Sequence, residues 1–256
     1  MSAISVNTLL DEAKCYSCYV PGDVIFLSKL ALLDRISKRI FFKTILTFQS
    51  SADATSYSTP SFQPGANVLL LAVVTSSRIP AGASGTVAGN GLTWVVAAAG
   101  DTFNGSRTSI FRSVGSSPTN TALTASWGAN VQTSCQIKVI EVPNAKITGA
   151  NGADGIAQFN SEGTHGGNQI SVIWGIAPNI NNSILTSAVA TGVTEIGVDI
   201  NSPTAGPGWI LYTQDSWLNP TICNVLLHST GNTEINAFLD MVATTANECS
   251  VEIAHV

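Results

Sequence analysis

Two cysteines three positions apart, Cys15 and Cys18, form the sharpest local motif in this chain of 256 residues. A zinc site needs two more ligands, and neither a second such pair nor two closely spaced histidines follow in the sequence. A thioredoxin-like redox pair belongs in a β-α-β context, and the surrounding sequence does not have that pattern. Because residues three apart share one helix face, both thiols can also line a packing surface. We favour helix packing; a disulfide or redox pair and a metal site are the alternatives.

The remaining chemistry-bearing residues form no recognisable catalytic set. The three histidines, His165, His228 and His255, are far apart in sequence, and neither GxSxG nor GxxxxGK occurs. A carboxylate pair for sugar hydrolysis can be distant in sequence. However, the acidic residues after position 46 are scattered along strand-like segments, which is typical of solvated faces and turns. The sequence therefore predicts no enzyme, no catalytic residue, no metal site and no cofactor.

Aromatic residues offer a second kind of site, because tryptophan can stack on sugars. Trp94 and Trp174 fall inside apolar runs and are predicted to lie in the core. Trp209 follows Pro207-Gly208, and Trp217 comes just before Asn219-Pro220, so these two are the candidates for exposed ligand contact. Cysteine behaves as a small apolar residue in interiors, so the two cysteines in alternating strand-like runs, Cys135 and Cys249, are also predicted to be core.

Charge narrows the classes of partner. Charged residues make up 11% of the chain, well below the roughly 25% of ordinary soluble domains. Residues 1–46 carry a net charge of +2 and residues 47–256 a net charge of −7, and no Lys or Arg occurs from Ile147 onward. Nucleic-acid binding needs clustered basic residues, so we expect no nucleic-acid partner.

Targeting signals and cysteine usage indicate where the protein is made. The first twelve residues have no basic, then apolar, secretory pattern. The most apolar run, Val24–Leu33, is too short to span a bilayer, so we expect no membrane partner. Five cysteines are an odd number, which argues against a complete disulfide framework and favours synthesis in a reducing cytoplasm.

Residues 1–46 read as two short helices separated by Pro21-Gly22. Asn7 or Thr8 can cap the first helix and Asp23 the second. Two helices this short cannot bury their apolar stripes alone, so they need the rest of the chain or another protein. We predict that this segment docks onto a partner. The predicted docking residues are Leu9, Leu10, Cys15, Cys18, Phe26, Leu30 and Leu33.

After Lys43 the apolar pattern switches from helical to alternating, which is typical of strands. Val68–Val74 is almost wholly apolar and predicts a strand buried on both faces. Asn90-Gly91 and Asn104-Gly105 predict tight turns. Turn signals about every ten residues, without long amphipathic helices, indicate a mainly β, antiparallel sandwich body behind a short α-helical segment.

Four ordered sequence matches indicate that the β body contains an internal repeat. Val68–Val74 is echoed by Ile170–Ile176, and Ser134–Val139 by Glu248–Ile253. Two shorter matches, Gly91–Val96 with Gly192–Gly197 and Ile110–Arg112 with Leu211–Thr213, lie between them. We predict a docking segment 1–46 and two immunoglobulin-like or jelly-roll-like halves, 47–146 and 147–256. The glycine-rich stretch Gly149–Gly155 would link the halves. Two tandem sandwiches and one pseudo-symmetric sandwich both fit this pattern.

Three segments carry a resemblance to a known group of proteins. The opening Asn7–Cys18, followed by Leu30–Ile36, resembles a short N-terminal module of tailed-bacteriophage proteins. The stretch Ser56–Pro143, with its FxPxANxLLLA and GNGLTW segments, is similar to β domains from phage and prophage structural genes. The resemblance implies an accessory virion component, either a head decoration or cement protein or a collar or tail fibre subunit. The chain lacks the long repetitive shaft of an extended fibre, which favours a compact decoration-type role.

Interpretation as an accessory virion component leads to several expectations. The chain would be a non-enzymatic virion protein, made in the host cytoplasm, whose leading helices dock and whose β body is displayed. Its partners would be other virion proteins of the capsid, neck or tail, and it would form a homo-oligomer on the particle. The alternative is a carbohydrate- or receptor-binding adhesin module that contacts a host-surface glycan through Trp209 or Trp217. A glycan-degrading enzyme is a third and weaker hypothesis.

Overall fold

The computed structural model describes residues 42–77, 85–100, 106–162, 169–179, 181–191, 210–217, 222–230, 236–240 and 245–256. The chain divides into two units, Met1–Arg39 and Ile40–Val256, and every described residue belongs to the second unit. The predicted leading helices lie outside the described residues. The predicted segment end at residue 46 is too late, because Lys43–Leu46 already form part of the first strand.

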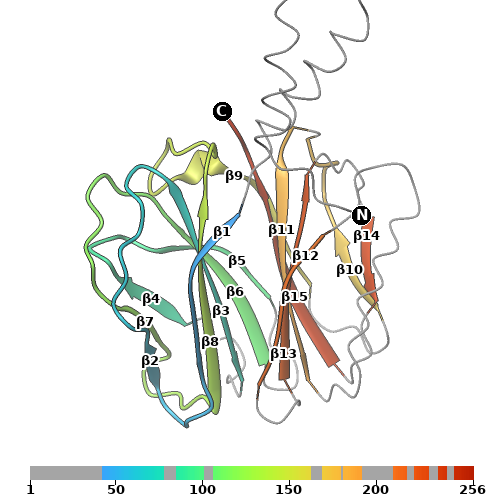
Figure 1. Cartoon of the computed structure of the whole chain (residues 1–256). Coiled ribbons are helices and arrows are strands. Elements are labelled where there is room, and N and C mark those ends of the chain that lie inside the picture. Colours follow the sequence, from blue (N-terminus) through green and yellow to red (C-terminus); the bar gives the residue numbers. More distant parts are fainter. Residues whose placement is uncertain are drawn as a thin grey trace, which may run out of the picture. The chain divides into compact units, whose positions relative to one another are not determined.

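Two antiparallel sheets make up the first half of the β body (Figure 1). The first large sheet has the order β1 (Lys43–Ser50), β8 (Ser134–Val142), β3 (Leu69–Ser77), β6 (Ser106–Ser113) and β5 (Val95–Ala99). The first small sheet has the order β2 (Ser56–Ser58), β7 (Leu123–Ser126) and β4 (Thr86–Gly89). Side chains from both sheets, among them Leu70 and Leu123, form one hydrophobic core between them.

The second half repeats this plan. The second large sheet has the order β12 (Ile210–Trp217), β13 (Ile222–Thr230), β11 (Ser183–Thr191), β15 (Thr245–Ile253) and β9 (Ile156–Glu162). The second small sheet pairs β10 (Gln169–Ile173) with β14 (Asn236–Asp240). A short 3-10 helix, η1 (Ala153–Gly155), precedes β9. The mainly β, antiparallel fold predicted from the sequence is confirmed.

Both halves wind in the same way. In the first half the first strand pairs with the last (β1 with β8), the second with the one before it (β2 with β7), and β3 with β6. The second half has the matching pairs β9 with β15, β10 with β14, and β11 with β13. This is a long hairpin rolled into a sandwich, the jelly-roll pattern. The predicted duplication is therefore present, and of the two predicted sandwich types each half is a jelly roll.

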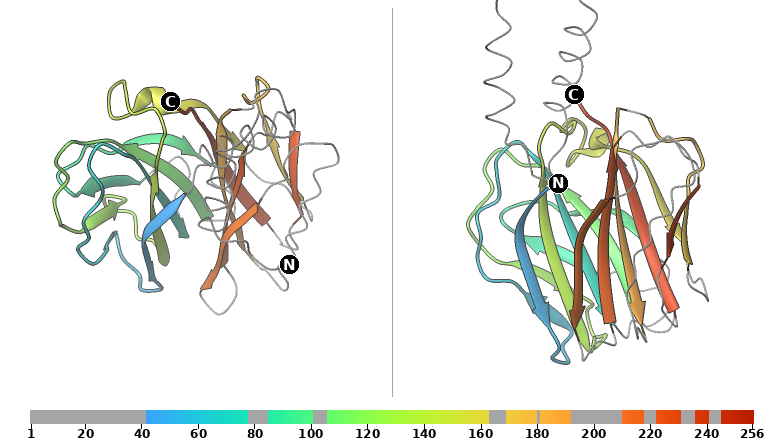
Figure 2. Two further views of the ribbon diagram at one scale, coloured as in Figure 1. Left: turned by 45° about the horizontal axis from the view of Figure 1, so that its top comes forward. Right: turned by 45° about the vertical axis from the view of Figure 1, so that its right-hand side comes forward.

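The two halves share a core. Leu71 and Ile140 of the first large sheet belong to the same hydrophobic cluster as Leu185 and Val251 of the second. Polar contacts cross the same interface. The hydroxyls of Thr108 and Ser187 lie 2.6 Å apart, and Asn247 Nδ2 donates to the Ser106 carbonyl at 2.8 Å. In the views of Figure 2 the two large sheets accordingly lie back to back.

The first large sheet is covered on both faces, which explains why the run Val68–Val74 is almost wholly apolar. The first large sheet packs against the small sheet on one face and against the second half on the other, so every residue of β3 and β8 is buried. The predicted double burial of Val68–Val74 is thus confirmed from Leu69 onward. The predicted turn at Asn90-Gly91 is also present, because both residues have positive φ, 56° and 64°. Asn104-Gly105 lies outside the described residues.

The individual sequence echoes are mostly wrong although the duplication is real. Val68–Val74 belongs to β3, whose counterpart by sheet position is β11, whereas its echo Ile170–Ile176 covers most of β10. Similarly, Ile110–Arg112 lies in β6, but its echo lies in β12, the counterpart of β5. The Gly192–Gly197 echo lies outside the described residues. Among the matches that lie in described residues, only that between β8 and β15 joins the correct strands.

Even that match is out of register. Leu70 lies opposite Glu141, and Ile184 lies opposite Glu252, so Glu252 takes the place of Glu141. The same ladders place Ala246, not Cys249, at the position of Cys135. Both thiols are fully buried as predicted, but Cys135 faces the small sheet and Cys249 faces the other half. Trp94 and Trp174 are buried, which confirms their predicted core position.

Candidate functional site

Most residues singled out from the sequence lie outside the described part of the chain. This applies to the seven docking residues, Leu9, Leu10, Cys15, Cys18, Phe26, Leu30 and Leu33, and to Trp209. The backbone of Trp217 ends β12 opposite Ile222, and its side chain is outside the description. Because these side chains lie outside the described residues, the candidate site is built from other residues.

The first described residues, Phe42 and Lys43, are fixed to the β body by burial and by an ion pair. Phe42, the first described residue, is 7% exposed and belongs to the core that joins the two halves. Lys43 follows it, and its Nζ lies 2.9 Å from Glu141 Oε2. The Lys43 side chain is 66% exposed, so its ion pair adds little stability by itself. The ion pair does, however, join the first residue of β1 to β8.

Glu141 also reaches a third segment. Its Oε1 accepts the backbone N–H of Gly65 at 2.7 Å. Gly65 follows Pro64 in the connection that leads from β2 to the buried strand β3. A Cβ atom on Gly65 would come within 2.9 Å of the same Oε1, so glycine allows this close approach. One carboxylate therefore ties together β1, β8 and the loop that leads into β3.

The second half has the same arrangement with different donors. Glu252 is 3% exposed, and its Oε1 accepts the backbone N–H of Asn179 and Asn182 Nδ2, each at 2.7 Å. Its Oε2 accepts Gln158 Nε2 at 2.6 Å. Gln158 lies opposite Glu252 on β9, as Lys43 lies opposite Glu141 on β1. Buried carboxylates require such hydrogen bonds, so we assign both glutamates a structural role.

Sequence reasoning missed both glutamates. A signal was present, because Pro64-Gly65 and Pro178-Asn179 each precede a central strand. In addition, the strand of each large sheet that comes last in the sequence ends with Glu followed by an apolar residue. The signal is weak without the fold, because only the sheet order brings each glutamate beside its loop.

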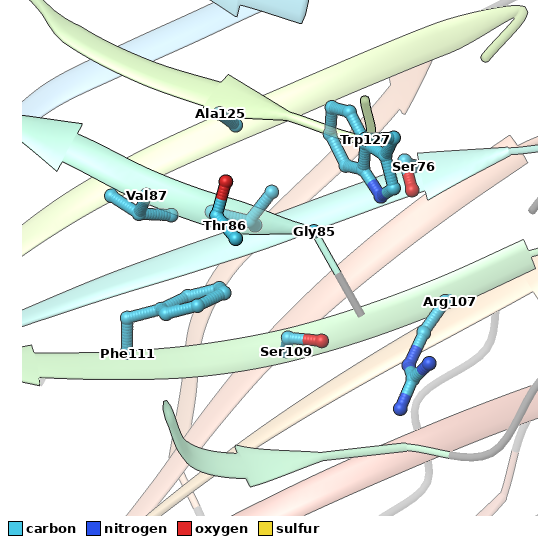
Figure 3. A pocket seen from close by; sticks show the side chains of 10 residues that line it. Ser76, Gly85, Thr86, Val87, Arg107, Ser109, Phe111, Ala125 and Trp127 are labelled. Atoms are coloured by element: carbon cyan, nitrogen blue, oxygen red, sulfur yellow. The ribbon is translucent and has the colours of Figure 1, made fainter. Parts of the chain in front are cut away.

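A small hollow lies between the two sheets of the first half (Figure 3). Trp127, just after β7, and Phe111 on β6 line it from different sheets, with Gly85 and Arg107 near one end. Its volume is about 10 Å³, close to the minimum that holds one water molecule. A Cβ on Gly85 would come within 2.8 Å of the Trp127 ring, so the walls are already close-packed. The hollow is too small for a sugar or nucleotide.

The buried thiols of Cys135 and Cys249 are unreactive. Burial raises the pKa of Cys135 and Cys249 well above the ordinary value, so both stay protonated near neutral pH. The thiol, unlike the thiolate, is a poor nucleophile. Burial also raises the pKa of Tyr57 to about 12, and its hydroxyl lies 2.7 Å from the Ala52 carbonyl and 2.8 Å from the Gln132 carbonyl. These groups join loops and fill the core.

Within the described ranges, no group of three or more His, Cys, Asp or Glu is arranged to hold a metal ion. Nor does that part of the chain contain a helix long and apolar enough to cross a membrane. No protein-family model, curated protein or solved structure matches the chain.

Proposed function

We propose that this protein is a non-enzymatic structural component of a tailed-phage virion. Its leading segment, Met1–Arg39, docks onto another virion protein, and the double jelly roll is the part displayed. A decoration or cement protein of the capsid fits best, and a collar or fibre subunit is the other form of the same proposal. The chain acts there as a homo-oligomer.

The observation that carries the proposal is how the chain divides its apolar residues. The second unit, Ile40–Val256, contains hydrophobic cores built from its own residues. The division after Arg39 leaves the predicted apolar stripe, which includes Leu30 and Leu33, on the other unit. Such a stripe is marginal on two short helices alone, so it favours a partner surface.

The chemistry of the β body supports the non-enzymatic part. Two of its buried carboxylates, Glu141 and Glu252, hold loops, and two of its thiols are protonated in the core. Jelly rolls occur in viral capsid proteins, and also in lectins. That likeness is one of architecture alone, and a fold by itself does not assign a function.

The deciding experiment compares two forms of the protein in the phage or prophage that carries its gene. One is the full chain and the other lacks Met1–Arg39. We expect mass spectrometry of purified particles to find the full chain and not the shortened one. Circular dichroism and thermal melting of the shortened protein check that its β body still folds.

Point variants sharpen this comparison. Leu30→Asp places a charge on the predicted apolar stripe, whereas Arg35→Gln changes a residue that helical spacing turns about 140° away from Leu30. Incorporation should fall with the first change and persist with the second. Equal incorporation of the shortened and full proteins would reject the docking role. Binding of the shortened protein to a glycan array would instead favour the adhesin alternative.

A further inference from the structure

The connection between the two halves forms a closed loop rather than an extended linker. Asp154 N–H donates to the Thr148 carbonyl at 3.1 Å, and Thr148 Oγ1 donates to Asp154 Oδ2 at 2.7 Å. Gly149 and Gly152 have φ of 75° and 74°, which glycine adopts without strain. A Cβ on Gly155 would lie 2.5 Å from the Lys146 carbonyl oxygen, so the two ends of the loop are in contact. We call this meeting point, Asn144–Lys146 beside Gly155, the neck.

The residues that follow β15, Ala254–Val256, run across the neck. Lys146 N–H donates to the Ala254 carbonyl at 2.9 Å, and Val256 N–H donates to the Asn144 carbonyl at 3.2 Å. On the other side of the neck, Ala254 N–H donates to the Gly155 carbonyl at 3.0 Å. Ala145 and His255 form an isolated antiparallel bridge. In Figure 1 the mark for the C-terminus lies beside η1, in keeping with these bonds.

These bonds differ in kind from the core between the halves. Most of that interface is apolar, and apolar burial is non-directional; the directional contacts across it include the side-chain hydrogen bonds between Thr108 and Ser187 and between Asn247 and Ser106. Backbone hydrogen bonds to both sides of the neck fix position and direction. We propose that residues Ala254–Val256 are a clasp that keeps the neck closed and so fixes the two jelly rolls in one orientation. This inference concerns the β body alone and does not depend on the proposed function.

The sequence supplies a sharp probe of the neck. Lys146 is exposed and is the last Lys or Arg in the chain, so trypsin cutting after it separates the halves at the neck. Cleavage of a folded protein requires local opening around the cut bond. The rate of cleavage after Lys146 therefore reports how often the clasp releases.

The test compares Val256→Pro with Val256→Ala under limited trypsin digestion of the full chain. Proline removes the N–H that donates to Asn144, whereas alanine keeps it and matches the loss of the side chain. Since one hydrogen bond is lost, we expect cleavage after Lys146 to be several-fold faster in Val256→Pro. The buried Lys138 serves as the internal reference, and cleavage after it should stay unchanged.

Two results would overturn the proposal. Equal cleavage of the two variants after Lys146 means that the clasp does not hold the neck. Equal acceleration after Lys146 and Lys138 means that the substitution weakens the whole β body instead. After cleavage of the unsubstituted protein, we expect both fragments to elute together in size-exclusion chromatography, because the shared core remains.

Discussion

Glu141 and Glu252 occupy the same place in the two jelly rolls, and each accepts a backbone N–H at 2.7 Å from the loop that leads into the central strand of its sheet. The partner on the edge strand differs, since Lys43 faces Glu141 and Gln158 faces Glu252. The carboxylate and its loop are common to both halves, whereas the third partner is charged in one and neutral in the other. The loop contact is therefore the constant part of the arrangement.

Glu252→Gln should weaken the fold more than Lys43→Ala. Glu252 is almost fully buried and accepts three hydrogen bonds, two on Oε1 and one on Oε2, and the oxygen that becomes an amide nitrogen can no longer accept. We expect a loss of about 2–4 kcal/mol in the free energy of unfolding. Removing the exposed Lys43 amine should cost about 1 kcal/mol or less. Urea unfolding of both variants measures this, and equal losses would contradict the structural role of Glu252.

Gly155→Ala should destabilise the protein, and Gly175→Ala should not. A Cβ at Gly155 would lie 2.5 Å from a backbone oxygen, which cannot turn aside, whereas no atom lies within 4 Å of a Cβ at Gly175. We expect a cost of about 1–3 kcal/mol for the first change and less than about 0.5 kcal/mol for the second. Melting temperatures of the two variants test the contrast. A tolerant Gly155 would mean that the neck is looser than described.

Cys135 and Cys249 should resist alkylation in the folded protein. Both thiols are fully buried, and burial raises their pKa, so neither the access nor the thiolate that iodoacetamide needs is present. Peptide mass spectrometry should find both unmodified at pH 8 and both modified after unfolding in guanidinium. Rapid labelling of either cysteine without denaturant would contradict its position in the core.

His255 should make the protein less stable in acid. Burial lowers its pKa from the ordinary 6.5 to about 4, despite the Asn144 carbonyl 3.3 Å from Nδ1. As the pH falls, the unfolded chain therefore takes up this proton before the folded protein does. The stability that neutral His255 contributes is fully present above pH 6.5 and is lost as the pH falls towards 4. The urea midpoint of the unsubstituted protein should fall more between pH 7.5 and pH 4.5 than that of His255→Gln. The other two histidines are common to both proteins, so parallel curves would contradict the assignment to His255.

Features that depend on a short stretch of sequence could be predicted from the sequence alone. The apolar run that contains Leu69–Val74 predicts a strand buried on both faces, and the structure places one sheet on each side of it. Asn90-Gly91 predicts a tight turn, and both residues have positive φ. The burial of Cys135 follows from its place in an alternating apolar strand.

The pairing of the two halves could not be read in the same way. Strands with alternating apolar residues match one another at many offsets, so similarity linked β3 to β10 although sheet position links it to β11. A shift by an odd number of residues moves side chains to the opposite face. That is why Cys135 and Cys249 align in sequence but face different cores.

By itself, the sequence determined that this is a mainly β protein with repeated strands behind a leading segment of different character, because periodicity and turn chemistry are local properties. Only the tertiary structure decided that the halves are jelly rolls sharing one core, and that Glu141, Glu252 and the neck tie distant segments together. The physical reason is that these contacts join residues from 70 to 112 positions apart. Such contacts depend on sheet order and register, which no short stretch of sequence encodes.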